Sequence, residues 1–119
     1  MKQLTMVTIM IIAYTMMAQD VYSQDKQPEI IITEISELQN YETSYIKGEV
    51  TKILDEDEFR LEDSGGKIKV YTGWKNTNIV KKGDKITVKG KLDPGLVKEF
   101  YASEIIMEDG EKIKLEPDE

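Results

Sequence analysis

The sequence predicts an all-β protein: a small closed barrel of five antiparallel strands, with a short helix and an export signal before it. Apolar and polar residues alternate with a period of two in four short runs between Tyr45 and Leu92, and the apolar-rich segment Lys98–Ile106 predicts a fifth strand. This is the pattern of strands that bury one face. Turn residues such as Asp63-Ser64-Gly65-Gly66 separate the runs. Gly48 and Gly90 stand inside two of the runs, where a tightly coiled barrel leaves no room for a side chain.

Residues 1–23 have the pattern of a signal peptide. Lys2 supplies a positive charge, and the uncharged stretch Leu4–Ala18 follows. At about 15 residues this stretch is shorter than the roughly 20 that a membrane-spanning helix needs. Cleavage after Ala18 or after Ser23 fits the small-residue preference, and an uncleaved anchor is the alternative. The sequence therefore predicts a periplasmic or secreted protein, with no stable membrane insertion after cleavage.

The predicted domain organisation is a signal peptide at 1–23, a polar tether at 24–32 and one folded domain at 33–119. The chain carries 23 acidic and 16 basic residues, for a net charge of −7, and it has no histidine or cysteine. This acidic balance argues against a general polyanion binder. Without cysteine the chain forms no disulfide and accepts no lipoprotein anchor. The commonest general base, the thiol nucleophile and the usual zinc ligands are also missing, so we expect neither an enzyme nor a cofactor.

The elements follow from local patterns. Thr33 as N-cap, followed by spaced Ile and Leu residues, predicts a short helix over Thr33–Leu38. The inward-facing residues of the strands are expected to form the core, and Ile113 with Leu115 is expected to extend or pair with the fifth strand. The predicted inward residues of the first four strands are Ile46, Gly48 and Val50; Phe59 and Leu61; Ile68, Val70, Thr72 and Trp74; and Ile86, Val88, Gly90 and Leu92.

Four segments in order resemble the OB-fold: Gly48-Glu49-Val50, Asp55 to Asp63, Gly66 to Val70, and Gly83 to Gly90. With the signal peptide in front, the chain is similar to the bacterial OB-fold family of small periplasmic proteins linked to stress tolerance. The resemblance covers about Thr33 to Ile106. It implies a five-stranded Greek-key barrel and an envelope protein that binds a small or cationic ligand, or another envelope component, without performing a reaction.

The binding face of an OB barrel lies across its second and third strands, beside the loop between strands four and five. On this chain the outward residues there are Arg60, Lys67, Lys69 and Tyr71, with the loop residues 93–96 at the edge. One aromatic ring with three cations suits a sugar ring, a base or another small molecule. We therefore predict that these four residues bind the ligand, and that Phe59 and Trp74, on the inward phase, belong to the core.

Two charged features have a simpler interpretation. The cluster Asp55-Glu56-Asp57-Glu58 is expected to be a solvated turn, with Asp55 and Asp57 as a weak candidate for a hard cation. Outward lysines on the strands either prevent edge-to-edge pairing or form a local basic face. They are Lys47, Lys52, Lys67, Lys69, Lys85, Lys89 and Lys91.

Three functions remain open at this level. The first is a binding module for a small molecule or an envelope glycan. The second is a nucleic-acid-binding OB domain, which the acidic charge and the export signal disfavour. The third is a protein-interaction or scaffold module, for which an exposed apolar patch around Leu96, Val97 and Tyr101 would be the distinguishing feature.

Overall fold

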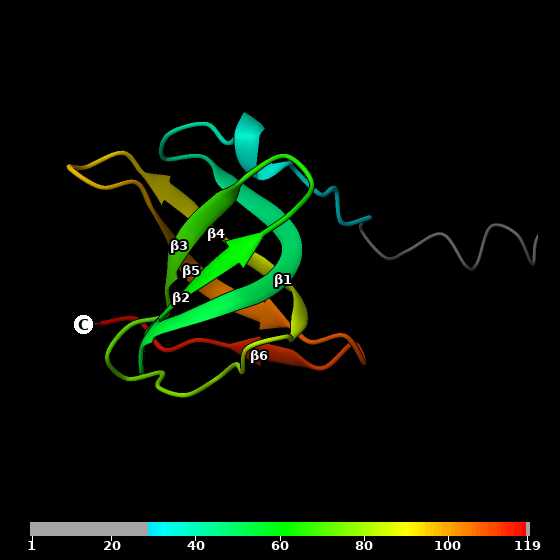
Figure 1. The fold of residues 1–119 in the computed structure, drawn as a ribbon, viewed down its shortest axis with the longest axis vertical. Coiled ribbons are helices and arrows are strands. Elements are labelled where there is room, and N and C mark those ends of the chain that lie inside the picture. The colour runs from blue at the N-terminus through cyan, green and yellow to red at the C-terminus, as the bar shows by residue number, and fades with distance from the viewer. Residues whose placement is uncertain (1–28, 119) are drawn as a thin grey trace, which may run out of the picture. The chain divides into compact units, whose positions relative to one another are not determined.

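A long, strongly curved strand, β1 (Thr43–Asp55), organises the barrel in the computed structural model, which describes residues 29–118 (Figure 1). Its first half pairs with β4 (Lys85–Asp93) and its second half with β2 (Glu58–Glu62), both antiparallel. Register shifts in the β1–β2 ladder bend the strand. A Cβ at Gly48 would overlap the carbonyl oxygen of Glu62, so glycine is required where the two strands come closest.

The barrel closes through a parallel pair. β3 (Lys67–Tyr71) pairs antiparallel with β2 and parallel with β5 (Glu99–Ile106), which in turn pairs antiparallel with β4. The predicted five-stranded barrel is confirmed, although its closing pair is parallel and not antiparallel. Gly90, where β4 and β5 shift register, is also required: a Cβ there would overlap the carbonyl of Tyr101 and lie 2.8 Å from Cε2 of Phe100.

A sixth strand, β6 (Lys112–Lys114), pairs antiparallel with β5 after the Asp109-Gly110 turn, as predicted. It continues the sheet order β3-β2-β1-β4-β5-β6. It carries the chain back along the barrel toward the C-terminal segment 115–118 (Figure 1).

The core is made by the inward residues of the strands, as the alternation predicts. Phe59 is buried, which confirms its predicted place. Trp74 is 61% exposed, so its predicted place in the core is wrong. The reason is that β3 ends at Tyr71 and Gly73, with φ of +94°, turns the chain before the alternation reaches Trp74. The buried hydrophobic residues are Ile35, Ile46, Val50, Phe59, Leu61, Ile68, Val70, Ile86, Val88, Leu92, Phe100, Ile105 and Leu115.

The helix expected over Thr33–Leu38 is shorter than predicted: it is a single 3₁₀ turn, η1 (Ile35–Glu37). Its N-cap is Glu34, not Thr33, and Glu34 makes no side-chain capping bond. The carboxylate of Asp63 performs that role from the β2–β3 turn, accepting a bond of 2.8 Å from the backbone N–H of Ile35. This bond, together with the buried Ile35 side chain, fixes η1 against β3 at one end of the barrel.

The chain divides into two units, residues 1–30 and 31–119, and η1 and strands β1 to β6 belong to the second. The predicted signal peptide, its two cleavage positions and residues 24–28 of the tether lie outside the described residues. Among residues 29–118, no helix has the length and apolar character required to cross a membrane.

Candidate ligand-binding site

The four predicted site residues lie on the outward face of neighbouring strands. Arg60 of β2 stands directly across from Lys69 of β3, and Lys67 and Tyr71 occupy the outward positions on either side of Lys69. Because β3 also pairs with β5, Tyr101 stands directly across from Tyr71. The structure divides this face into two pockets that meet at Lys69.

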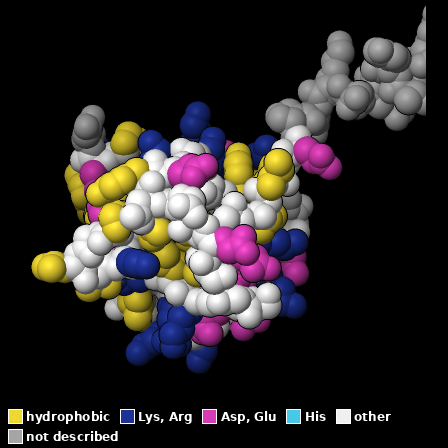
Figure 2. Space-filling model, turned by 90° about the horizontal axis from the view of Figure 1, so that it is seen from above, with side chains coloured by type: hydrophobic (Ala, Val, Ile, Leu, Met, Phe, Trp, Pro, Cys, Tyr) yellow, Lys and Arg dark blue, Asp and Glu magenta, His cyan; other side chains and the backbone are white. Residues whose placement is uncertain are grey.

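The first pocket, here called the basic pocket, has a volume of about 460 Å³. Three of the four predicted residues line it, and Lys98 from the β4–β5 loop adds a fourth cation. Its apolar lining comes from η1, β1, β3, β4 and the β4–β5 loop: Ile35, Leu38, Leu54, Ile68, Leu92 and Val97. Figure 2 views the barrel from the end that carries η1 and the β4–β5 loop. Hydrophobic side chains are exposed there beside basic ones, and acidic side chains gather toward one side.

The cations of the basic pocket differ in how they are held. The Nε of Arg60 donates to the hydroxyl of Thr51 at 3.0 Å and lies 3.5 Å from a carboxylate oxygen of Glu62, which orients the guanidinium. Lys67 and Lys98 are exposed and form no ion pair with any of the residues 29–118. Their ammonium groups are thus available to an anionic group in the pocket.

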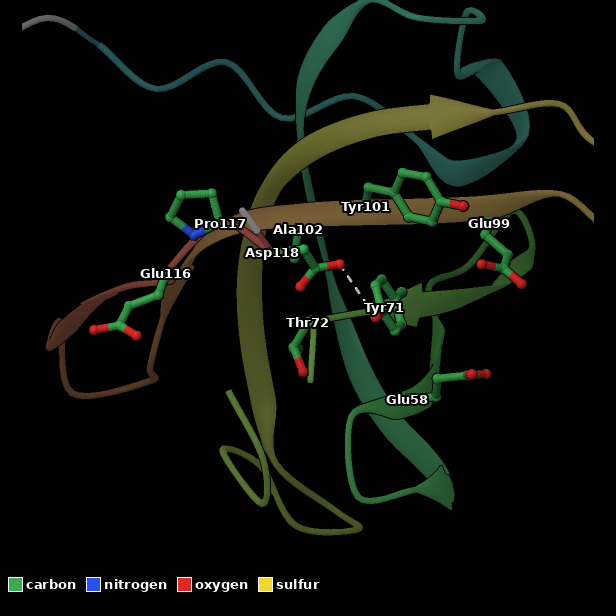
Figure 3. Close-up of a pocket in the computed structure, with 10 residues that line it drawn as sticks. Glu58, Tyr71, Thr72, Glu99, Tyr101, Ala102, Glu116, Pro117 and Asp118 are labelled. Carbon is green, nitrogen blue, oxygen red and sulfur yellow. Dashed lines mark hydrogen bonds between the residues drawn. The ribbon is translucent and has the colours of Figure 1, made fainter. Parts of the chain in front are cut away.

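The second pocket, here called the tyrosine pocket, has a volume of about 450 Å³. Tyr71 and Tyr101 meet edge to face with ring centroids 5.6 Å apart, and the Tyr71 hydroxyl donates to Asp118 at 3.2 Å (Figure 3). Glu58 and Glu99 lie on the same side as the two rings. Burial is the main cause that raises the pKa of both tyrosines, and the nearby carboxylates add to it, so both rings are neutral phenols near pH 7.

Lys69 separates the two pockets. Its Nζ lies 3.0 Å from Glu99 and 3.4 Å from Glu58, both of which line the tyrosine pocket, while its side chain lines the basic pocket. The hydrogen bond to Glu99 raises the pKa of Lys69 above its ordinary value, against a smaller opposing effect of desolvation. Lys69 is therefore a fixed, paired cation rather than a free one.

The C-terminal segment forms one wall of the tyrosine pocket. The buried side chain of Asn76 donates to the carbonyl of Glu116 at 2.8 Å and accepts from its N–H at 2.9 Å. The same amide donates to the carbonyl of Thr72 at 2.8 Å. This clamp places Pro117 and Asp118 beside Tyr71.

Comparison with known proteins agrees with this architecture. The sequence model of the family described as "Bacterial OB fold (BOF) protein" matches residues 12–112. The chain belongs to the bacterial OB-fold family. The solved structure of the hypothetical protein ygiW from E. coli is similar at 20% identity, with a TM-score of 0.55, covering 72% of this chain and 94% of that one. At that identity the likeness shows the fold alone. A search of curated proteins found no match.

In this OB-fold protein the acidic loop between β1 and β2 has the geometry of a turn. Asp55 accepts the N–H of Glu56 at 2.7 Å, and the backbone carbonyl of Asp57 accepts the N–H of Thr72 at 2.9 Å. No group of three or more histidine, cysteine or acidic residues able to hold a metal ion comes together among residues 29–118. Asp55 and Asp57 therefore do not form a metal site with a third such side chain.

The other lysines predicted to face outward from the strands of this bacterial OB-fold chain do not line the basic pocket: Lys47, Lys52, Lys85, Lys89 and Lys91. Lys85, Lys89 and Lys91 lie on β4, which pairs with β1 and β5 and not with β2 or β3; Lys91 stands directly across from Tyr101 on β5. Lys89 lies over the Tyr45 ring, 5.7 Å from its centroid. Lys47 occupies the neighbouring outward position on β1. These residues supply matched controls for the pocket lysines.

Sequence reasoning missed several residues of the site. The sequence pattern predicts no site role for Lys98 or Glu99, because barrel closure decides which loop and which strand lie beside β3. The sequence predicts Tyr71 as a ligand-binding residue and Tyr101 only as part of an exposed apolar patch, but it does not predict that the two rings are neighbours. Phe100 is buried and Tyr101 next to it faces outward, so the strand pattern could indicate an outward Tyr101. The sequence does not indicate the β3–β5 pairing that places Tyr101 beside Tyr71. Asp118 carried no sequence signal.

Proposed function

We propose that the chain is a non-enzymatic, exported OB-fold module that binds a small molecule or an envelope glycan, and that it acts in envelope stress tolerance in the periplasm or outside the cell. The observation that carries the proposal is the basic pocket itself. Arg60, Lys67 and Lys69, which the sequence predicts as ligand-binding residues, line one cavity of about 460 Å³ together with Lys98. The size is in the range of small-molecule sites.

The lining favours a ligand with an anionic group and an apolar or ring-shaped body. Lys67 and Lys98 offer charge-assisted hydrogen bonds, and the oriented Arg60 guanidinium offers a planar donor for a carboxylate or a phosphate. A ligand that covers the apolar side chains of the pocket removes them from water, and this contributes favourably to the free energy of binding. With no histidine or cysteine in the chain, binding without chemistry is the role that this pocket supports best.

The test is an amide-resolved NMR titration of the protein with peptidoglycan fragments, calcium and a short single-stranded oligonucleotide at low and physiological salt. We expect shifts around Lys67, Lys69 and Lys98 with a glycan fragment, and their loss in a Lys67→Met, Lys98→Met double variant. Lys47→Met, Lys85→Met removes the same number of charges elsewhere and should leave binding intact. Shifts with the oligonucleotide alone that weaken steeply with salt would favour the nucleic-acid function instead.

A protein-interaction function is the second candidate, because the β4–β5 loop ends in exposed apolar side chains. Leu96 is fully exposed and Val97 is 62% exposed, next to the basic Lys98. This loop projects from the barrel in Figure 1. If no compound in the panel shifts the pocket amides, and a partner purified with the protein is lost on Leu96→Ser, this second function replaces the first.

A further inference from the structure

The two pockets on the β2–β3–β5 face carry opposite charge and lie on either side of Lys69 and its ion pairs. Arg60, Lys67 and Lys98 make the basic pocket positive, while Glu58, Glu99 and Asp118 make the tyrosine pocket negative. The Lys69 ion pairs with Glu58 and Glu99, at 3.4 and 3.0 Å, form the ridge between them. A ligand lying along β3 would therefore meet cations at one end and carboxylates at the other.

The tyrosine pocket has the chemistry of an ammonium site. Two neutral phenol rings lie at its wall with carboxylates beside them, and an organic cation gains from both aromatic faces and negative charge (Figure 3). A bare metal ion is a poorer occupant, because no group of three acids suited to holding one forms among residues 29–118. The carboxylates also come from β2, β5 and the C-terminal segment, so they surround a volume instead of converging on a point.

We infer that the ligand is dipolar, with its anionic group in the basic pocket, its ammonium group in the tyrosine pocket and its body crossing the Lys69 ridge. This inference rests on the proposed function for the basic pocket and adds the second half of the ligand. Lys69 then acts as a positioning residue, holding Glu58 and Glu99 in place by its two ion pairs.

The strand sets the length of this dipole. Lys67, Lys69 and Tyr71 occupy successive outward positions of β3, and a strand rises about 3.3 Å per residue, so the outer two are roughly 13 Å apart. An extended peptide spans at most about 3.3–3.6 Å per residue, so a chain of about four residues brings its two termini to the two pockets. The structure thus points to a short, peptide-like zwitterion.

The test uses the tetrapeptide Ala-Leu-Leu-Ala in four forms: free, N-acetylated, C-amidated, and blocked at both ends. Binding to the full protein is measured by NMR titration. We expect the free peptide to bind most tightly and each single block to weaken binding by about threefold to tenfold. A free dipeptide is too short to reach both pockets, so its two ends should not contribute together.

Variants assign each end of the peptide to its pocket. In Tyr101→Leu, acetylation should no longer weaken binding while amidation still does, and Lys98→Met should show the reverse pattern. Tyr45→Leu and Lys47→Met are the matched controls on the β1–β4 face, and both blocks should retain their effect in them. Because the four peptide forms are compared on unaltered protein, the main result does not depend on any variant folding.

The outcomes separate this inference from the proposed function. If amidation weakens binding and acetylation does not, the inference is overturned while the basic pocket keeps its role. If no peptide form binds but a glycan fragment shifts the amides near Lys67 and Lys98, the inference likewise falls and the proposed function stands. Loss of the acetylation effect in Tyr45→Leu as much as in Tyr101→Leu would also refute the assignment of the ammonium end.

Discussion

Replacing Gly90 with alanine should destabilise the barrel at the point where β4 and β5 shift register. The added Cβ would overlap the backbone carbonyl of Tyr101 and lie 2.8 Å from Cε2 of Phe100, a ring with no exposed surface. Carbon atoms rest about 3.5–4.0 Å apart, so the two strands must separate by roughly 1 Å. Neither neighbour can yield easily, because one is backbone in a ladder and the other is fully buried.

Overpacking of this kind costs about 1–3 kcal/mol of the free energy of unfolding. For a domain of this size, each kcal/mol lowers Tm by about 4–8 °C, so a loss of about 2 kcal/mol lowers it by about 8–16 °C. Thermal and urea unfolding followed by circular dichroism would measure both quantities. The spectrum of the folded variant should keep its β character.

Gly95→Ala is the matched control for this prediction. The nearest atom to a Cβ at Gly95 is a carboxylate oxygen of Asp93 at 3.6 Å, an ordinary contact. Alanine there should be neutral, or stabilising by about 0.4–1 kcal/mol through the unfolded chain. If Gly90→Ala unfolds at the same temperature as the unaltered protein, the close approach of β4 and β5 is not a constraint and the argument for that glycine fails.

Three further predictions concern the supports of the site. Asn76→Ala should cost about 1–3 kcal/mol by leaving buried partners unpaired, and hydrogen exchange at the Glu116 amide should accelerate as the tyrosine-pocket wall loosens. The pKa values of Tyr71 and Tyr101 are raised in the folded state, so the neutral phenols stabilise the fold below about pH 10. This stabilisation is lost as the pH rises through the folded-state pKa values. Phenol absorbance and urea unfolding at alkaline pH would measure the two pKa values and the loss of stability. Asp63→Ala removes the acceptor of three backbone N–H groups, so it should cost about 2 kcal/mol or more in urea unfolding and weaken binding in the basic pocket by releasing η1.

Each of these has a result that would contradict it. Unchanged exchange at Glu116 in Asn76→Ala would mean that other contacts hold the C-terminal segment. If all the phenols titrate at the pKa of the unfolded chain, the raised pKa values of Tyr71 and Tyr101 are contradicted. For Asp63, the matched control is Asp109→Ala, because the Asp109 side chain accepts a bond from only one N–H, that of Glu111, in an exposed turn. Equal costs for the two variants would show that the three bonds of Asp63 do not anchor η1.

Much of the barrel was predictable because alternation is a local property of a strand. Ile46, Val50, Leu61 and Val88 are buried as their phase predicts. The two structural glycines were also predictable, since a glycine in the middle of an otherwise regular strand indicates a close backbone approach. The pattern failed at Trp74, where the strand had already ended at Tyr71 and a left-handed glycine at 73 changed the direction of the chain.

The candidate site was predictable only in part, because the strand pattern is local and the neighbours of each strand are not. The outward phase of β2 and β3 identified Arg60, Lys67 and Lys69, because residues two apart on one strand share a face whatever the tertiary structure. The division of this face into two pockets depends on β5 pairing in parallel with β3, which brings Glu99 to Lys69 and Tyr101 to Tyr71.

The sequence by itself therefore determined which residues face inward and outward, where the strands coil most tightly and which cations belong to the outward face of β2 and β3. These properties depend on neighbours one to four positions away along the chain. The tertiary structure alone decided that Lys69 is paired, that the C-terminal Asp118 reaches Tyr71, and that the face carries positive charge at one end and negative charge at the other. Lys69–Glu58 crosses the β2–β3 pair, but Lys69–Glu99 and Tyr71–Asp118 join residues 30 and 47 positions apart, and barrel closure and the Asn76 clamp set their geometry.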